Sequence, residues 1–126
     1  MKLTGRPIFA GEAKGTALVS QSPMSFYGGV NPETGEIIER GHELRGESVS
    51  GRVLVFPYGK GSTVGSYVLY RLKKNGMAPC AIVNSKCETI VAVGAIISEI
   101  PCVDLVDIAK IPPNAEVRIG GADVEV

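Results

Sequence analysis

The sequence predicts an α/β fold in which a small β-layer packs with a β-α-β core. An apolar, β-branched run at residues 53–56 precedes a glycine-rich turn and then a stretch with helical periodicity. A second apolar run, residues 78–84, follows that helix, and a right-handed crossover would place it parallel to the first run. Alternating residues on either side of Gly120 and Gly121 indicate a hairpin near the end of the chain.

The N-terminal half is expected to supply strands and loops. Residues 1–11 alternate weakly and predict a first strand, and residues 12–20 predict a second one after a short bend. Residues 21–35 are too rich in glycine, proline and small hydroxyl residues for regular structure. A short edge strand is expected at residues 36–39, and residues 41–51 form a polar connector to the central strand.

The helix of the β-α-β unit is predicted from residue spacing. Pro57 ends the strand before it, because proline cannot donate to a sheet ladder. Apolar residues then recur at steps of three and four, which places them on one face of a helix: Val64, Tyr67, Val68 and Leu72. Asn75 and Gly76 supply a left-handed stop after a basic last turn.

The C-terminal third begins with an ambiguous segment, residues 88–99. One face of a helix would hold Ile90, Val93, Ile97 and Ile100, whereas residues 90–93 could equally form a strand. The length of the segment favours a helix. Residues 102–103 and 107–108 predict short strands, and residues 112–115 turn the chain into the final hairpin.

Composition restricts the class of protein. A chain of 126 residues, 44% of them hydrophobic, is expected to form one domain, residues 1–126, around a single core. Its 13 basic and 13 acidic residues give zero net charge, so neither nucleic acid nor an anionic membrane is an expected partner. No apolar run approaches the length of a membrane span, and the N-terminus lacks the hydrophobic region of a signal peptide. We therefore expect a cytoplasmic protein.

The cysteines and the histidine do not indicate a metal site. Cys80, Cys87 and Cys102 lack the spacing of a zinc knuckle or an iron–sulfur motif, and an odd count argues against a secreted disulfide framework. Each lies among apolar neighbours, which indicates small core residues. His42 is the only histidine, and one histidine cannot make a metal site. A loop or capping role is expected for it.

The turn at residues 59–63, Gly-Lys-Gly-Ser-Thr, allows two interpretations. In the simpler one, Ser62 or Thr63 is the N-cap of the following helix, and the two glycines only permit the turn. In the other, a serine beside the unpaired N–H groups of a helix N-terminus is a proton acceptor or an anion ligand. The turn is not a Walker A motif, because a glycine separates Lys60 from Ser62 and Leu54 stands where the first glycine belongs.

The long loop at residues 21–35 is a second candidate for function. Two aromatic residues and two glycines in its middle argue against disorder, so we expect a packed surface loop that presents Ser22 and Ser25. A merely structural loop explains the same composition equally well.

Three motifs resemble a known family. They are Ser-Pro-Met-Ser-Phe-Tyr-Gly-Gly-Val-Asn-Pro-Glu-Thr-Gly at residues 22–35, Gly-Glu-Ser-Val-Ser-Gly-Arg-Val-Leu-Val-Phe-Pro-Tyr-Gly-Lys-Gly-Ser-Thr-Val-Gly-Ser-Tyr-Val-Leu-Tyr at residues 46–70, and Val-Ala-Val-Gly-Ala-Ile-Ile-Ser-Glu-Ile-Pro-Cys-Val-Asp at residues 91–104. On these motifs the chain is identified as a small subunit of the aconitase X family. The likeness covers nearly the whole chain, which most resembles the small subunits that act on mevalonate 5-phosphate.

The resemblance implies a swivelling β/β/α domain, like the mobile domain of aconitase. It implies a heterodimer with a large aconitase X subunit, and a 4Fe–4S iron–sulfur cluster held by that partner. The implied reaction dehydrates (R)-5-phosphomevalonate to trans-anhydromevalonate 5-phosphate, a step towards isoprenoids. A different hydroxy acid, such as hydroxyproline, is the rival substrate. A non-catalytic docking or regulatory domain is the rival outside the enzyme class.

The resemblance also assigns residues. The family's proton acceptor falls on Ser62, and many relatives carry a second serine where this chain has Thr63. Dehydration next to a carboxylate needs a base for a poorly acidic C–H proton, so the serine would have to be held as an alkoxide by N–H groups at the helix N-terminus. Residues expected by position to bind the substrate are Lys60, Gly61, Thr63, Ser22 and Ser25, and Phe26 and Tyr27 are expected to line the cleft beside Ser25.

Overall fold

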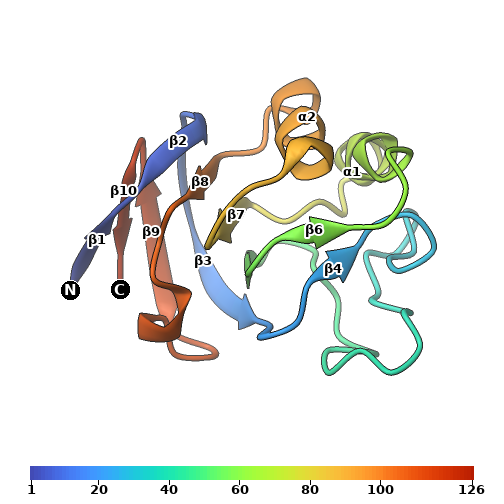
Figure 1. Ribbon diagram of the computed structural model, residues 1–126, viewed down its shortest axis with the longest axis horizontal. Coiled ribbons are helices and arrows are strands. Elements are labelled where there is room, and N and C mark those ends of the chain that lie inside the picture. Colours follow the sequence, from blue (N-terminus) through green and yellow to red (C-terminus); the bar gives the residue numbers. More distant parts are fainter.

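The computed structural model describes residues 1–126 and contains an eight-stranded sheet, a two-stranded sheet and two α-helices (Figure 1). The order of the large sheet is β1-β10-β9-β3-β5-β7-β8-β2, and the small sheet pairs β4 with β6. The strands are β1 Lys2–Thr4, β2 Arg6–Phe9, β3 Glu12–Val19, β4 Met24–Ser25, β5 Val53–Phe56, β6 Gly59–Lys60, β7 Ala81–Asn84, β8 Cys102–Asp104, β9 Glu116–Gly120 and β10 Asp123–Glu125. The helices are α1 Gly65–Lys74, α2 Thr89–Ser98 and the short 3-10 helix η1 Ile108–Lys110.

The large sheet curls so that its two ends are joined by one kinked segment. β1 and β2 occupy opposite ends of the strand order, yet only Gly5 separates them in the chain. A Cβ atom at Gly5 would collide with the carbonyl oxygen of Asp104, so the kink requires glycine. The prediction of a single strand over residues 1–11 is therefore wrong: the segment is two strands that pair with β10 and β8.

The central strands are buried on both faces, because they lie between two apolar layers. In β5, Leu54 and Phe56 belong to a cluster beneath the helices, whereas Val53 and Val55 point into a second cluster inside the curl of the sheet. This alternation follows from the two-residue period of a strand. It explains why the strand reads as an unbroken apolar run in the sequence.

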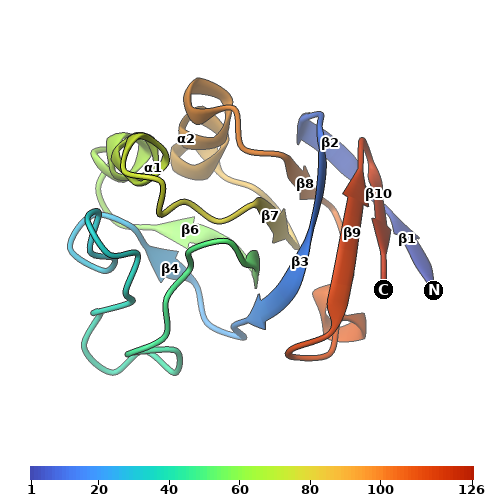
Figure 2. The same cartoon turned by 180° about the vertical axis from the view of Figure 1, so that it is seen from behind.

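The predicted β-α-β unit is confirmed. β5 and β7 are parallel neighbours with Val53 opposite Ala81, and α1 connects them. Both helices cover the same side of the central strands, while β9, β10 and β1 form the part of the curled sheet that lies away from the helices (Figures 1 and 2). The helix stop is also confirmed, because Gly76 has a φ of 72° and its N–H donates to the carbonyl oxygen of Lys73.

The predicted face of α1 is correct only in part. Val68 and Leu72 are buried, but Val64 is 44% exposed and Tyr67 is 65% exposed. The side chain of Leu69 takes the central place in the core instead.

The predicted face of α2 is correct only in part, because Ile100 is buried in the core but two of the other predicted residues are exposed. The buried residues of α2 are Val91, Gly94, Ala95 and Ser98. The residues Val93 and Ile97 of the predicted apolar face are 43% and 41% exposed. Gly94 faces Leu69 of α1, and the absence of a side chain there lets the two helices approach closely. Apart from Val91, small residues therefore line the inner side of the helix, while Val93, Ile96 and Ile97 remain outside.

Other elements were predicted with mixed success. The strand at residues 12–20, the helix at residues 88–99 and the C-terminal hairpin are confirmed as β3, α2 and β9 with β10. Residues 36–39 form only isolated bridges, and residues 107–108 lead into η1 rather than a strand. Asp107 accepts a hydrogen bond from the N–H of Ala109, which stabilises that turn. No helix of the structure has the length and apolarity that a membrane crossing requires.

Gly94→Val is expected to destabilise the fold, because a Cβ atom at this position would lie 2.5 Å from Cδ1 of the buried Leu69. Overpacking of this kind costs about 1–3 kcal/mol in the free energy of unfolding. Urea denaturation followed by circular dichroism measures the change. Gly120→Ala is the matched control, because the space beside Gly120 is open; equal stability of both variants and the parent would contradict the packing described.

One ion pair, between the half-exposed Arg6 and the buried Asp104, joins β2 to β8. Arg6 donates from Nε and Nη2 to the two carboxylate oxygens of Asp104 at 2.9 and 2.7 Å, and the N–H of Cys87 donates to the same carboxylate at 2.9 Å. Burial alone would raise the pKa of Asp104, but these hydrogen bonds and the charge of Arg6 hold it below its usual value. The carboxylate therefore stabilises the fold in its ionised form.

The stabilisation by Asp104 is expected to depend on pH. Since its folded-state pKa is lowered, the contribution is complete above the ordinary value of 3.8 and is lost as the pH falls through the folded-state value. Asp104→Asn is expected to lower the free energy of unfolding by about 1–3 kcal/mol near pH 7. The difference from the parent chain should shrink as the pH falls below the ordinary value of 3.8 and through the lower folded-state pKa. Urea titrations at several pH values test this, and a pH-independent difference would contradict it.

Candidate active site

The turn at residues 59–63 lies between the central strand and the first helix. β5 ends at Pro57, as predicted, and β6 then pairs in parallel with β4, with Met24 opposite Gly59 and Ser25 opposite Lys60. Figure 1 shows the two short strands side by side below the helices. The pairing brings the two candidate loops of the sequence together, although about thirty residues separate them in the chain.

Ser62 is exposed at the entrance to α1. Its Oγ accepts a hydrogen bond from the N–H of Val64 at 3.2 Å, and its carbonyl oxygen accepts one from Gly65 at 2.9 Å. Thr63 is exposed too, and its carbonyl oxygen accepts from Ser66 at 3.1 Å. The N-cap position is Val64, which has no side-chain cap of its own. Ser62 Oγ nevertheless satisfies the N–H of Val64, so the simpler interpretation is confirmed in part for Ser62, whereas Thr63 Oγ1 makes no such contact.

The electrostatics of this turn favour a negative charge near Ser62. The backbone N–H groups of Ser62 and Thr63 donate to no other group of the chain, whereas those of the next residues already have acceptors. The positive end of the α1 dipole adds to them. The turn can thus offer two free donors to an anion.

Gly61 is the residue that permits the turn. Its φ of 92° lies in the region that favours glycine. A Cβ atom there would also lie 2.6 Å from Oγ of Ser25. The glycine therefore sets both the backbone direction before Ser62 and the distance to the neighbouring loop.

Glu39 is the site residue that the sequence analysis missed. Its Oε2 lies 3.0 Å from Nζ of Lys60, and its Oε1 accepts a hydrogen bond from the N–H of Ser25 at 3.3 Å. One carboxylate therefore holds β6 and β4 together from the side. No local pattern predicts this role, because residues 36–39 have the composition of an edge strand and the contact partners are distant in the chain.

Ser22 belongs to a different hydrogen-bond cluster. Glu43 accepts at one carboxylate oxygen from Ser20 Oγ at 2.9 Å, from Gln21 N–H at 2.6 Å and from Ser22 N–H at 2.9 Å. Burial would raise the pKa of Glu43, but these donors lower it. His42 accepts from the N–H of Leu44 at Nδ1, which agrees with the predicted loop role. Ser22 is thus held by this cluster rather than by the turn at residues 59–63.

The two aromatic residues after Ser25 have different positions. Phe26 is buried and packs edge-on against Phe56, with 5.9 Å between ring centroids, so the expectation that it lines a cleft is wrong. Tyr27 is 57% exposed, and its carbonyl oxygen accepts from Ser25 Oγ at 3.1 Å.

The three cysteines are free thiols. Cys102 is buried, and Cys80 and Cys87 are half-buried. A hydrogen bond with Cys87 and burial raise the pKa of Cys102, and burial raises that of Cys80. Neutral thiols of this kind are weak metal ligands. The structure contains no group of three or more His, Cys, Asp or Glu that could hold a metal ion.

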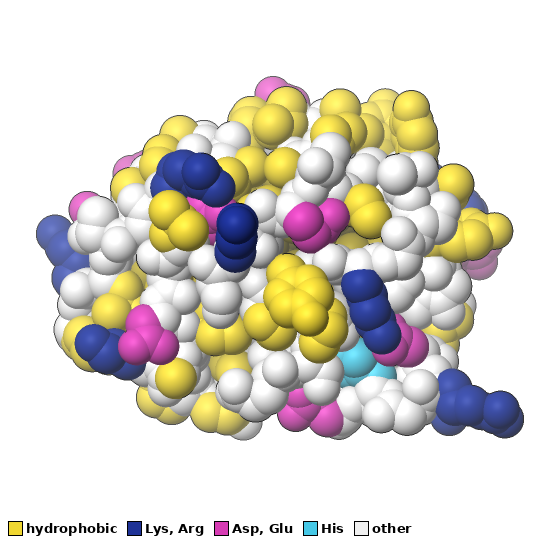
Figure 3. All heavy atoms as spheres, in the orientation of Figure 1, with side chains coloured by type: hydrophobic (Ala, Val, Ile, Leu, Met, Phe, Trp, Pro, Cys, Tyr) yellow, Lys and Arg dark blue, Asp and Glu magenta, His cyan; other side chains and the backbone are white.

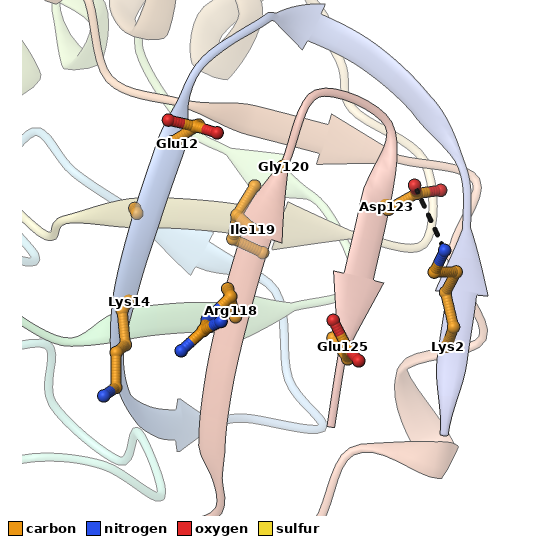
Figure 4. A pocket seen from close by; sticks show the side chains of 9 residues that line it. Lys2, Glu12, Lys14, Arg118, Ile119, Gly120, Asp123 and Glu125 are labelled. Atoms are coloured by element: carbon orange, nitrogen blue, oxygen red, sulfur yellow. Dashed lines mark ion pairs between the residues drawn. The ribbon is translucent and has the colours of Figure 1, made fainter.

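Two hollows lie on different faces of the molecule. A groove of about 250 Å³ between the helices is lined by Thr63, Val64, Ser66, Tyr67, Thr89, Ile90 and Val93. A broader hollow of about 470 Å³ lies on β3, β9, β10 and β1, where charges of both signs alternate (Figure 4). Lys2 and Asp123 form an ion pair there at 3.8 Å. None of the predicted site residues lines that hollow, whereas Thr63 lines the groove.

Comparison with known proteins supplies the family. The family model for the aconitase X swivel domain matches residues 2–126. The chain belongs to this family.

Relatives match this swivel domain over most or all of its length. The phosphomevalonate dehydratase small subunit of Thermococcus kodakarensis is 55% identical over 126 residues, which is 100% of this chain and 95% of the relative. The protein of the same name from Methanosarcina acetivorans is 61% identical over 107 residues, which is 85% of this chain and 74% of the relative.

A solved structure agrees with the fold. The crystal structure of Thermococcus kodakaraensis aconitase X in its holo form matches with a TM-score of 0.97 and 54% identity, over 99% of this chain and 97% of the other. The predicted β/β/α fold class and the aconitase X resemblance are therefore confirmed.

Glu39→Gln is expected to loosen the turn of the swivel domain, because a neutral amide holds Lys60 less strongly than a carboxylate does. An ion pair of this exposure contributes at most about 1 kcal/mol, so amide hydrogen exchange at Ser25 and Lys60 should accelerate by up to about fivefold. Glu36→Gln is the matched control, since the side chain of Glu36 is exposed and forms no ion pair. Unchanged exchange in Glu39→Gln would contradict the anchoring role.

Proposed function

We propose that this chain is the small subunit of a phosphomevalonate dehydratase, a hydro-lyase that acts together with a large subunit. The observation that carries the proposal is the identity of 55% with the small subunit from Thermococcus kodakarensis over all of this chain. The substrate in this proposal is (R)-5-phosphomevalonate, and the product is trans-anhydromevalonate 5-phosphate. The reaction removes a proton from the carbon beside the carboxylate and a hydroxide from the next carbon.

Ser62 is the proton acceptor in this proposal. Its exposed Oγ accepts the N–H of Val64 at 3.2 Å, and an alkoxide at this point would strengthen that hydrogen bond. The positive end of α1 favours the same charge. These interactions support a basic oxygen most strongly when water is excluded, because an exposed alkoxide would take a proton from solvent.

The neighbouring residues bind the substrate in this proposal. The free N–H groups of Ser62 and Thr63 suit a carboxylate or phosphate oxygen. Lys60 keeps 47% of its side chain exposed although it pairs with Glu39, so its ammonium can also meet a phosphate. Gly61 permits the close approach of Ser25 to the turn, and Ser22 precedes Ser25 on the same loop, where Glu43 holds its backbone.

The iron–sulfur cluster implied by the family is assigned to the large subunit. Cys80 faces Lys14 at the start of the chain, Cys102 lies in the core, and no group of three or more candidate ligands exists in this chain. The residues of the small subunit therefore do not fit a cluster, and no step of the proposal runs through one.

The test uses this chain together with its purified large subunit and (R)-5-phosphomevalonate. Ser62→Ala is expected to lower kcat by about 100-fold or more, because it removes the base while the complex still forms. Ser50→Ala is the control, since Ser50 lies on the polar connector away from the turn, and its kcat should equal that of the parent. Near-normal activity of an assembled Ser62→Ala complex would leave a non-catalytic docking domain as the better explanation.

Substrate choice is tested in the same assay. A panel of hydroxy acids with and without phosphate, hydroxyproline included, is offered to the parent complex. Preference for the phosphorylated acid supports the proposal, and preference for another hydroxy acid would reassign the enzyme within its family.

A further inference from the structure

The outer face of α2 has the composition of a covered surface. The helix, Thr-Ile-Val-Ala-Val-Gly-Ala-Ile-Ile-Ser, contains no charged side chain. Its inner side packs on the fold, yet Val93, Ile96 and Ile97 on its outer side are 43%, 50% and 41% exposed. A helix at the surface of a protein normally carries polar residues on its outer face, and one that is apolar all round is normally buried. We therefore expect another protein surface to cover this face of α2.

α1 extends the apolar surface towards the candidate site. Val64 and Tyr67 are 44% and 65% exposed, and they line the groove together with Ile90 and Val93. In Figure 3, hydrophobic side chains gather along the edge of the molecule where the two helices lie. Clustered apolar surface of this kind, as opposed to scattered single residues, marks an interaction site.

The groove reaches the turn that carries Ser62. Thr63 is one of its lining residues, so a body seated in the groove also contacts the turn next to Ser62. Relatives of this chain are named small subunits, which implies a large one. A single partner, the large subunit, would therefore cover both the exposed turn and the apolar groove beside it.

The charged residues of α1 indicate which side chains the partner's surface should carry. The last turn of α1 holds the basic residues Arg71, Lys73 and Lys74, whereas the apolar stretch of α2 adds no charge. Arg71 is exposed one helical turn after Tyr67 and therefore lies on the same side of α1. A surface that fits would be apolar in its centre and carry carboxylates where it meets this end of the helix.

We propose that the outer faces of α1 and α2, defined by Val64, Tyr67, Val93, Ile96 and Ile97, form the docking surface for the large subunit. The partner contributes an apolar patch with acidic residues at one edge. This inference rests on the proposed function, since it takes the partner to be the other subunit of the dehydratase. It adds the place of contact: docking on the helices brings the partner against the groove that Thr63 lines.

Val93→Asp tests the docking surface. A carboxylate in the centre of an apolar contact is expected to weaken binding of the large subunit by about 100-fold, measured by isothermal titration calorimetry. Because Val93 is 43% exposed, the isolated variant should fold, and circular dichroism with a thermal melt checks this. In activity titrations the variant should need more small subunit for half-maximal rate.

Pro113→Asp is the matched control. It also places a single carboxylate at an exposed apolar residue, but in the turn before β9, on the far side of the sheet from the helices (Figure 1). Its affinity for the large subunit should equal that of the parent chain.

The outcomes separate this inference from the proposed function. If the parent complex dehydrates the substrate and Val93→Asp binds the large subunit as tightly as the parent does, the docking surface is wrong and the function stands. If the parent complex forms but is inactive on (R)-5-phosphomevalonate, the function fails, while the binding comparison still decides the surface. A parent chain that self-associates, and loses this with Val93→Asp while binding the large subunit normally, would assign the surface to a second copy instead.

Discussion

The candidate site depends on the parallel pairing of β4 with β6, a ladder of only two residues on each strand. So short a ladder is weak by itself, and its stability comes from what lies around it. Glu39 bridges the two strands from the side. Gly59 leaves space for the Glu88 carboxylate that caps α2, and Gly61 leaves space for Ser25. The conformation of the turn before Ser62 thus depends on the absence of side chains at Gly59 and Gly61 and on the carboxylate of Glu39.

Elements whose signals are local could be predicted from the sequence. The strand at residues 53–56 is marked by a continuous apolar run and a proline stop, and α1 ends at a glycine with positive φ, as expected. The turn that carries Ser62 is predicted in the same way, because the sequence alone shows a glycine-rich turn between a strand and a helix. The proposal that Ser62 is a base rests on the family resemblance and not on spacing.

Features that depend on contacts between distant residues could not be predicted. Glu39 meets Lys60 and Ser25 only after the chain has folded, and nothing near it in the sequence distinguishes it from other exposed acids. The kink at Gly5 requires glycine because the backbone of β8 at Asp104 leaves no room for a Cβ atom. Most of the core side of α2 could not be predicted, because periodicity selects large apolar residues, whereas the close approach of the two helices at Gly94 selects a small one.

The partly misassigned face of α2 and the exposed turn have one physical explanation. Apolar residues such as Val93 and Ile97 have the pattern of a protein core, yet they are exposed in the isolated chain. We infer that a partner buries them. The dipole of α1 and the charge of Lys60 act weakly while water surrounds Ser62, since water screens them. A partner seated on the helices would remove water from the apolar groove and from the edge of the turn together. In our proposal, the apolar helix face is therefore what makes the electrostatics of the turn strong enough to support a basic serine, and assembly and activation are the same event.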